Sequence, residues 1–471
     1  MKPVVIPDPV RAAAAIRPEA PAIVAPDETV TWADLECRVA AVAAQFRGDL
    51  ASGDRLAVYR PTDVLYLVLL LAAFRARVVL CPINTRQPVS TVPALLDRIG
   101  CTALVAAPDP AWKDRPILDL DVAGESVPTP EPTWALSETA TLVFTSGSTG
   151  TPKAALHTLG NHVASARGLA EVLPLGPGDR WLLDLPLYHV GGLAILIRCV
   201  LAGATVVLPA PERSAEDVIA ECGVTHVSFV ATQLGRVLRR HPDKLAGVKA
   251  VLLGGSAIPP GLVARSRACD LPIHTSYGLT EMSSTVTVTP PGASADVLQT
   301  SGTVIPGREV RLADDREILV RGAALFAGYA DGAVVQRPAV GDGWFPTGDL
   351  GVWAEVDGVR MLRVVGRKDN LFISGGENVQ PEEVEAALGR LLGVQRGVVV
   401  PVADAEFGQR PVAFVEADTW TPDVWREALL RTLPAFKVPV AFHPWPSDVR
   451  EGMKVDRRRL AEAATRVRIE G

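Results

Sequence analysis

The sequence has few cysteines and no long apolar run. Its six cysteines lie far apart and form no CxxC pair, a spacing that supports neither a zinc site nor a disulfide framework. We therefore expect reduced thiols in a cytoplasmic protein. The most apolar stretch, residues 64–74, ends at Arg75 and Arg77. It has about half of the roughly 20 residues that a membrane-spanning helix needs. It therefore predicts a buried helix, and no membrane partner is expected.

The sequence also lacks an excess of basic residues. It has 47 Lys and Arg against 53 Asp and Glu, a net charge of -6, and the basic residues are scattered. Such a chain lacks the basic surface that binds nucleic acid or an anionic membrane. The residues after Met1 do not form the apolar core of a secretory signal. We expect a small-molecule partner, and the sequence leaves the oligomeric state open, a homodimer included.

The length of 471 residues predicts more than one domain. Apolar runs rich in β-branched residues alternate with longer helical patterns, which is typical of α/β layers. The predicted buried strands are residues 77–80, 205–208, 226–230 and 251–253. Between residues 301 and 365, short apolar runs and Gly-rich turns predict a small β-rich unit that completes the large domain.

The last hundred residues change character again. Pro381-Glu382-Glu383 predicts a helix start, because proline suits the first turn and carboxylates suit the positive end of the helix dipole. Strand-like residues 397–402 and 411–415 and a helical pattern over 422–432 follow. We therefore predict a large layered α/β domain over residues 1–368 and a small α+β domain over 369–471.

A loop of glycines and hydroxyls follows the predicted strand 142–144. It reads Thr145-Ser146-Gly147-Ser148-Thr149-Gly150-Thr151-Pro152-Lys153. Glycine lets the backbone approach a ligand closely, and successive N–H groups form an anion nest, so the loop predicts a polyphosphate site. It is not a Walker-type P-loop, because Lys153 stands between Pro152 and Ala154 and not in Gly-Lys-Ser/Thr. A surface loop without a ligand is the alternative.

This loop resembles the signature loop of the adenylate-forming superfamily, which contains acyl- and aryl-CoA synthetases, peptide-synthetase adenylation domains and luciferases. Further motifs follow in that family's order: Gly254-Gly255-Ser256, Ser276-Tyr277-Gly278-Leu279-Thr280-Glu281, Thr347-Gly348-Asp349, Gly366-Arg367, Ser374-Gly375-Gly376-Glu377-Asn378 and Lys454. The resemblance covers nearly the whole chain. It implies an ATP-dependent acid:CoA ligase that forms an acyl-adenylate and then an acyl-CoA thioester, with ATP, Mg²⁺ and coenzyme A as co-substrate.

The resemblance also implies roles for single residues. Tyr277 and the strip from Gly254 to Ser256 would hold the adenine, with Ser276 and Gly278 beside the nucleotide. Asp349 and Arg367 would contact the ribose. Glu281, with Thr145, would bind Mg²⁺, which prefers few carboxylates and keeps several waters. Without the motifs, Tyr277 would be interpreted as a packing residue, Asp349 as part of a turn and Glu281 as a surface residue.

The resemblance assigns the remaining chemistry mainly to the C-terminal part. Lys454 would be the catalytic lysine that reaches the carboxylate and the phosphate, although Met453 replaces the usual glycine before it. Thr280 would be a further catalytic residue. Asp369 would be the hinge of a mobile small domain, and Ser374, Gly375 and Gly376 would line a channel for coenzyme A, since glycines leave room there.

The acid is indicated by residues 181–193. No carboxylate stands in residues 187–192, where relatives that use amino acids carry an Asp, and the block is similar to the o-succinylbenzoate:CoA ligases of menaquinone synthesis. A dicarboxylate needs a cation, and Arg198, in an otherwise apolar helical pattern, is the candidate. His189 and Gly278 would also contact the acid.

Three alternatives stay open at this point. Arg198 can pair with a structural carboxylate. The acid can be another aryl or medium-chain acid. The chain can also be a catalytically inactive nucleotide-binding regulatory protein.

Overall fold

The computed structural model describes residues 4–112, 115–122, 132–145, 152–210, 212–255, 258–375, 377–404, 406–446 and 455–470. The helices are α1 (Pro9–Ile16), α2 (Trp32–Asp49), α3 (Val64–Ala76), α4 (Val92–Arg98), α5 (Leu159–Ala170), α6 (Val190–Ala202), α7 (Ala215–Glu221), α8 (Ala231–Arg240), α9 (Pro260–Ala268), α10 (Pro381–Leu388), α11 (Pro422–Leu430) and α12 (Arg457–Glu470). No helix in these ranges is long and apolar enough to cross a membrane.

Two large sheets form the main body. The nine-stranded sheet has the order β16 (Thr303–Val304), β15 (Ser284–Val288), β14 (Ile273–Leu279), β13 (Ala250–Leu253), β12 (His226–Phe229), β10 (Arg180–Leu182), β11 (Thr205–Val207), β2 (Pro21–Val24) and β3 (Thr29–Thr31). The seven-stranded sheet has the order β20 (Val334–Gln336), β19 (Gly328–Asp331), β9 (Lys153–Thr158), β8 (Thr139–Thr145), β5 (Val79–Pro82), β4 (Arg55–Tyr59) and β6 (Ala103–Ala106). The strands from β14 to β2 run parallel, as expected where helices cover a sheet.

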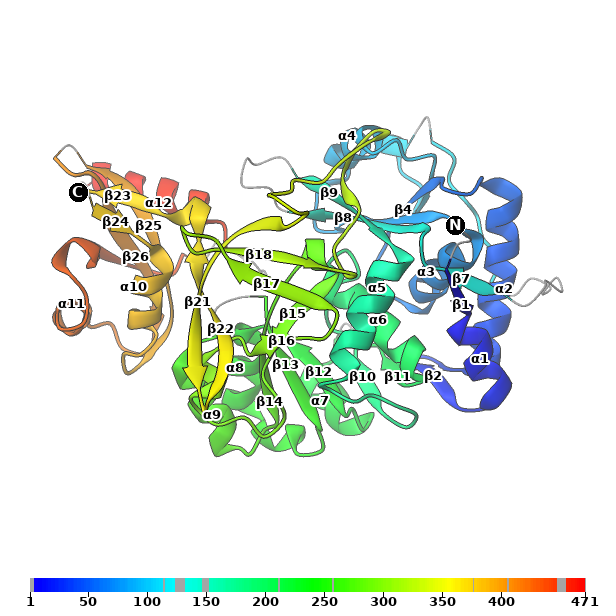
Figure 1. The fold of residues 1–471 in the computed structure, drawn as a ribbon, viewed down its shortest axis with the longest axis horizontal. Coiled ribbons are helices and arrows are strands. Elements are labelled where there is room, and N and C mark those ends of the chain that lie inside the picture. Colours follow the sequence, from blue (N-terminus) through cyan, green and yellow to red (C-terminus); the bar gives the residue numbers. More distant parts are fainter. Residues whose placement is uncertain are drawn as a thin grey trace.

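Four smaller sheets complete the described part of the fold. A two-stranded sheet pairs β1 (Val5–Pro7) with β7 (Thr133–Ala135), and a four-stranded sheet contains β17 (Arg308–Leu312), β18 (Glu317–Gly322), β21 (Phe345–Val356) and β22 (Val359–Arg367). The C-terminal part has the hairpin β23 (Phe372–Ser374) and β24 (Glu377–Val379) and the sheet of β25 (Val394–Asp404), β26 (Gly408–Ala417) and β27 (Ala441–Pro444). In Figure 1 this part, in orange and red, lies at one end of the molecule. The predicted fold class, a large layered α/β domain followed by a small α+β domain, is confirmed.

Two details differ from the predictions. Helix α3 extends to Ala76, and Arg77 caps it in the left-handed conformation (φ 60°), so the strand begins at Val79 and not at residue 77. Residues 301–365 are not one β-rich unit. Their strands β19 and β20 leave the four-stranded sheet and extend the seven-stranded sheet, because β19 pairs with the free edge of β9.

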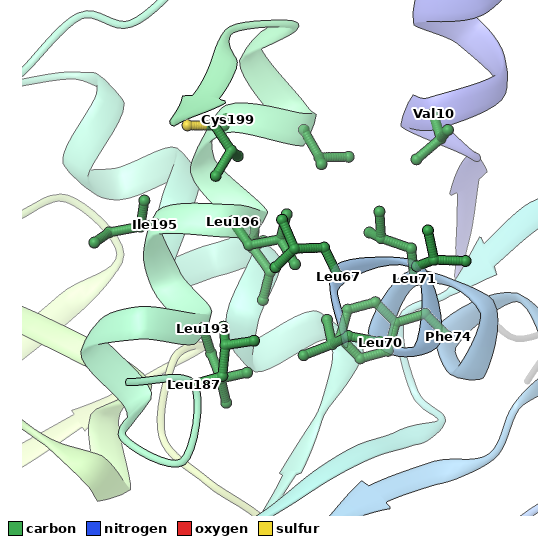
Figure 2. Close-up of a cluster of buried hydrophobic side chains, with 14 of the residues drawn as sticks. Val10, Leu67, Leu70, Leu71, Phe74, Leu187, Leu193, Ile195, Leu196 and Cys199 are labelled. Carbon is green, nitrogen blue, oxygen red and sulfur yellow. The ribbon is translucent and has the colours of Figure 1, made fainter. Parts of the chain in front are cut away.

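The largest core cluster joins α3 to α6. Figure 2 shows Leu67 and Leu70 of α3 pointing toward Leu193 and Leu196 of α6, with Leu187 close to Leu193. All five side chains are buried in one cluster. Fully burying each such side chain contributes about 1.5–3 kcal/mol. This packing fixes one face of α6 and thereby the direction of Arg198 on the same helix.

Candidate active site

One half of the site is built on the ends of β14, β21 and β22. The hydroxyl of Tyr277 donates to Asp349 Oδ2 at 2.7 Å, and Arg367 Nη1 donates to Asp349 Oδ1 at 2.8 Å. Asp349 and Arg367 are also direct partners in the pairing of β21 with β22. Burial and the Asp349 carboxylate raise the pKa of Tyr277, so the phenol stays protonated and remains a donor. The structure thus brings together three residues that the sequence motifs place far apart.

Two glycines shape this half of the site. Gly348 has φ +73°, and a Cβ there would lie 3.0 Å from Arg367 Nη2. Gly254 follows β13, and a Cβ on it would lie 2.8 Å from Ser276 Oγ, which donates to Leu253 O. A side chain at either position would therefore displace Arg367 or Ser276.

The other half surrounds Glu281 and Lys153. Thr145 and Lys153 are partners at the open end of the β8–β9 pair. Glu281 lies in the short 3-10 helix η4 (Thr280–Met282), and its Oε1 accepts a hydrogen bond from the Tyr329 hydroxyl at 2.6 Å. Lys153 Nζ lies 5.1 Å from the centroid of the same tyrosine ring.

Neighbouring backbone fixes η4. His157 Nε2 donates to Thr280 O at 2.8 Å, and Phe326 N donates to Glu281 O at 2.8 Å. Burial lowers the pKa of His157 to about 4, so this imidazole is neutral at pH 7. Thr280 and Glu281 are therefore held from β9 and from the segment that leads into β19.

Arg198 is buried next to these residues. Its Nη2 donates to Ser284 Oγ at 3.1 Å and to Thr285 Oγ1 at 3.3 Å, and its guanidinium carbon lies 5.4 Å from the centroid of the Trp181 ring. Within the described ranges it forms no ion pair with a carboxylate, so the structural pair considered above is not seen there. Burial, and then the charge of Arg308, lower its pKa to about 9. In the part of the chain that the structure describes, the guanidinium therefore has no counter-charge.

Strained backbone presents the partners of Arg198. Ser283 and Ser284 both have positive φ angles, 52° and 126°, which non-glycine residues rarely adopt. Ser284 faces Gly278, where a Cβ would lie 2.3 Å from Ser284 O. Thr285 pairs with Gly278, the residue after Tyr277. Arg198 is thus one strand pairing away from the half of the site that contains Tyr277, and the strain marks a site that the surrounding structure enforces.

His189 and the C-terminal residues occupy defined positions. His189 precedes α6, and its ring lies 4.7 Å from that of Tyr188. Asp369 lies in η6 (Lys368–Asn370), and Arg367 Nη2 is 3.5 Å from Asp369 Oδ2. Gly375 turns between β23 and β24 with φ +59°.

Several predicted site residues lie outside the described ranges. They are Ser146, Gly147, Ser148, Thr149, Gly150, Ser256, Gly376 and Lys454.

Four functional contacts were missed by sequence reasoning. Tyr329, Ser284, Thr285 and His157 contact predicted site residues but belong to none of the motifs. Each contact joins a strand to a helix or 3-10 helix that is distant in sequence, so no local spacing indicates it. The glycine before Tyr329 could have drawn attention to this position, because a glycine often marks a close backbone approach. Gly328 has φ +152° and lets β19 approach β20 closely.

A comparison with protein families decides the relationship. The sequence model described as AMP-binding enzyme matches residues 10–330. The chain belongs to the AMP-binding enzyme family.

Relatives of this AMP-binding enzyme include a ligase from Salmonella typhimurium. That protein is named 2-succinylbenzoate–CoA ligase and is 37% identical over 453 residues, which are 95% of each chain. The o-succinylbenzoate CoA synthetase of Bacillus subtilis has been solved with the acyl-adenylate intermediate OSB-AMP; it has a TM-score of 0.86 and 28% identity, covering 97% of this chain and 98% of that one. Its complex with ATP and magnesium ion has a TM-score of 0.86 and 27% identity, covering 97% and 100%.

Proposed function

We propose that this chain is a 2-succinylbenzoate–CoA ligase, which uses ATP to convert 2-succinylbenzoate into 2-succinylbenzoyl-CoA in menaquinone biosynthesis. The observation that carries the proposal is Arg198, a buried guanidinium that forms no carboxylate pair in the described chain, one strand pairing from Tyr277. The similarity to 2-succinylbenzoate–CoA ligase over 95% of the chain supports it. The six unpaired thiols fit a reducing compartment, and we place the enzyme in the cytoplasm.

In the first half-reaction, an oxygen of one of the two carboxylates of the acid attacks the α-phosphorus of ATP. The bond from that phosphorus to the β-phosphate oxygen breaks, and pyrophosphate leaves with the electron pair. The reacting groups are both anions, which at about 4 Å repel by roughly 4 kcal/mol in a partly screened site. Cations must offset this repulsion, and the chain offers Lys153 and Lys454 for that purpose.

The nucleotide would lie along the Tyr277, Asp349 and Arg367 cluster. The Tyr277 ring offers a flat face for the adenine. Both oxygens of Asp349 already accept a hydrogen bond, from Tyr277 and from Arg367. These two donors hold the carboxylate in place, and its oxygens would accept from the ribose hydroxyls.

The donors around Glu281 fit a magnesium ion that is bound mainly through the nucleotide. The described residues contain no cluster of three or more His, Cys, Asp or Glu that would form an all-protein site. Mg²⁺ commonly takes one or two carboxylates together with phosphate oxygens and water. Glu281 would supply the carboxylate and Thr145 a hydroxyl. Bound there, the ion would neutralise charge on the triphosphate.

The acid would lie between Gly278 and α6. Its distal carboxylate would pair with Arg198, and its ring would lie near the Trp181 side of this pocket. A carboxylate would supply a counter-charge for the guanidinium and would favour its charged form. His189, at the start of α6, would border the same pocket.

The second half-reaction needs a thiol at the adenylate. The sulfur of coenzyme A attacks the carbonyl carbon, and AMP leaves with the electrons of the broken C–O bond. We assign residues 1–368 to the domain that binds ATP and acid, and residues 369–471 to a mobile domain that carries Lys454. Asp369 would be the hinge between them, and Ser374, Gly375 and Gly376 would line the thiol channel.

An acid panel tests the proposed function. The purified chain is assayed for pyrophosphate release and thioester formation with 2-succinylbenzoate, benzoate and a medium-chain fatty acid. We expect kcat/KM for 2-succinylbenzoate to exceed the others by about 100-fold or more, because the other acids leave Arg198 unpaired. Preference for another acid would disprove the assigned substrate, and no release with any acid would instead indicate an inactive nucleotide-binding protein.

A further inference from the structure

Tyr329 lies between the two groups to which the proposed function gives the metal and the phosphates. Its hydroxyl donates to Glu281 Oε1 at 2.6 Å. The ammonium of Lys153 lies over the face of its ring, 5.1 Å from the centroid. One side chain therefore contacts both charged groups, which come from different elements, η4 and β9.

The fold holds this tyrosine in one place. In the pairing of β19 with β9, Tyr329 lies opposite Ala155, two residues after Lys153. The ring packs edge-on against Phe326, with the centroids 4.9 Å apart. Phe326 N in turn donates to Glu281 O at 2.8 Å. Strand pairing thus connects Tyr329 to β9, and Phe326 connects it to the backbone of Glu281.

The chemistry of the two contacts suits their partners. Burial, and then the Glu281 carboxylate, raise the pKa of Tyr329, so the phenol remains a donor at any working pH. A hydrogen bond to a carboxylate is stronger than one between neutral groups. It occupies Oε1, and in the described part of the chain no hydrogen bond reaches Oε2, which leaves this oxygen for a cation. The ring face attracts an ammonium within about 6 Å.

We infer that Tyr329 is a positioning residue that fixes Glu281 and Lys153 relative to each other, so that the carboxylate and the ammonium act on the same triphosphate. This inference rests on the proposed function. It assigns Tyr329 a role in binding ATP with Mg²⁺ that it does not have in binding AMP, because AMP lacks the β- and γ-phosphates.

Titration calorimetry of two tyrosine variants tests this role. Tyr329→Phe removes the hydroxyl and keeps the ring, and Tyr59→Phe is the matched control, because Tyr59 is also half-buried and donates its hydroxyl to Gln87 O at 3.0 Å. We expect Tyr329→Phe to weaken binding of ATP with Mg²⁺ by about tenfold and binding of AMP by less than about twofold. Tyr59→Phe should change neither affinity.

A second variant tests the contact with Lys153. Tyr329→Leu removes the ring as well, so an amine-acylating reagent followed by mass spectrometry should modify Lys153 faster than in Tyr329→Phe. Lys249, whose Nζ is 2.8 Å from Asp179 Oδ1, is the internal reference. An unchanged rate of Lys153 acylation would show that the Tyr329 ring does not position the ammonium.

The outcomes separate this inference from the proposed function. If the wild-type chain does not bind ATP with Mg²⁺, the proposed function fails. If the wild type binds and Tyr329→Phe binds equally well, only the role of Tyr329 is wrong. Equal losses for ATP and AMP would reduce Tyr329 to a structural residue and would also overturn the inference.

Discussion

At the residue scale, the unusual group is Arg198. A buried charge normally has a partner of opposite charge, since leaving water costs several kcal/mol. Arg198 instead donates to the hydroxyls of Ser284 and Thr285, which carry no charge. An aromatic ring, Trp181, lies beside it. Such an arrangement is poor for stability alone and suits a site that receives an anion.

Replacing this arginine should change acid selectivity. In Arg198→Gln we expect kcat/KM for 2-succinylbenzoate to fall by about 100-fold, because a buried charge pair with the substrate is lost. For benzoate, which has no second carboxylate, the loss should be less than about threefold. Steady-state kinetics with both acids measure this difference. A similar fall for both acids would mean that Arg198 supports the fold and does not bind the substrate.

The sequence indicated Arg198 but not what surrounds it. An arginine within an apolar helical pattern is visible in the printed chain, and so is the need for a partner. The partners Ser284 and Thr285 are 86 and 87 residues away. Their position depends on the bulge between β14 and β15, where the register shifts after Tyr277. Long-range pairing of this kind leaves no local pattern to read.

At the scale of elements, β9 connects the Lys153 end of the site with the buried layer beneath it. His157 on this strand donates to Thr280 O, and its ring lies 5.1 Å from that of His162 on α5. His162 in turn contacts Thr141 Oγ1 on β8 at 2.8 Å. Burial lowers the pKa of both histidines. Two neutral imidazoles therefore join β8, β9, α5 and η4.

This histidine pair predicts acid sensitivity. The pKa of His157 is about 4 in the folded chain against 6.5 in its ordinary state. Between these values the unfolded chain binds more protons, so stability falls as the pH drops. From pH 6.5 to pH 5, His157 alone should cost roughly 2 kcal/mol of unfolding free energy.

Urea unfolding of the wild type and of His157→Gln, at both pH values, measures this cost. Glutamine can still donate to Thr280 O but does not titrate, so the variant should lose roughly 2 kcal/mol less than the wild type. Equal losses in both proteins would show that other groups account for the acid sensitivity.

Elements with a clear local pattern were predicted well. Residues 205–208, 226–230 and 251–253 contain β11, β12 and most of β13, and Pro381 does begin α10. The β19–β20 hairpin was grouped with the small β-rich unit predicted over residues 301–365, whereas it extends the seven-stranded sheet. Its residues are as β-like as their neighbours, and the choice of sheet depends on the free edge of β9. That edge is a property of the assembled sheet, and it brings Tyr329 to Glu281.

At the scale of the whole molecule, hydrogen bonds and ion pairs hold the segment around Asp369 from both sides. Lys368 Nζ lies 2.6 Å from Asp315 Oδ2 and 3.0 Å from Glu317 Oε2 on the large part. On the other side, Gln380 Nε2 donates to Arg367 O at 3.0 Å. A hinge at Asp369 would therefore turn next to a fixed lysine. The order of the motifs predicted two domains. It could not predict these contacts on either side of Asp369, because they join residues that are distant in sequence.

The two-part arrangement leads to a test of Lys454. If this lysine neutralises the carboxylate and the α-phosphate, Lys454→Ala should lower acid-dependent pyrophosphate release by about 100-fold or more. Thioester formation from a pre-made adenylate should fall by less than about threefold, because the hinge at Asp369 would turn the small domain, and Lys454 with it, away from the phosphate for that step. Rapid-quench assays of each half-reaction measure both. Lys437→Ala is the control, since Lys437 belongs to the same part and pairs with Glu383 at 2.6 Å. Equal losses in both half-reactions would rule out this role, whereas a loss confined to adenylation would place the Lys454 ammonium at the phosphate in that step.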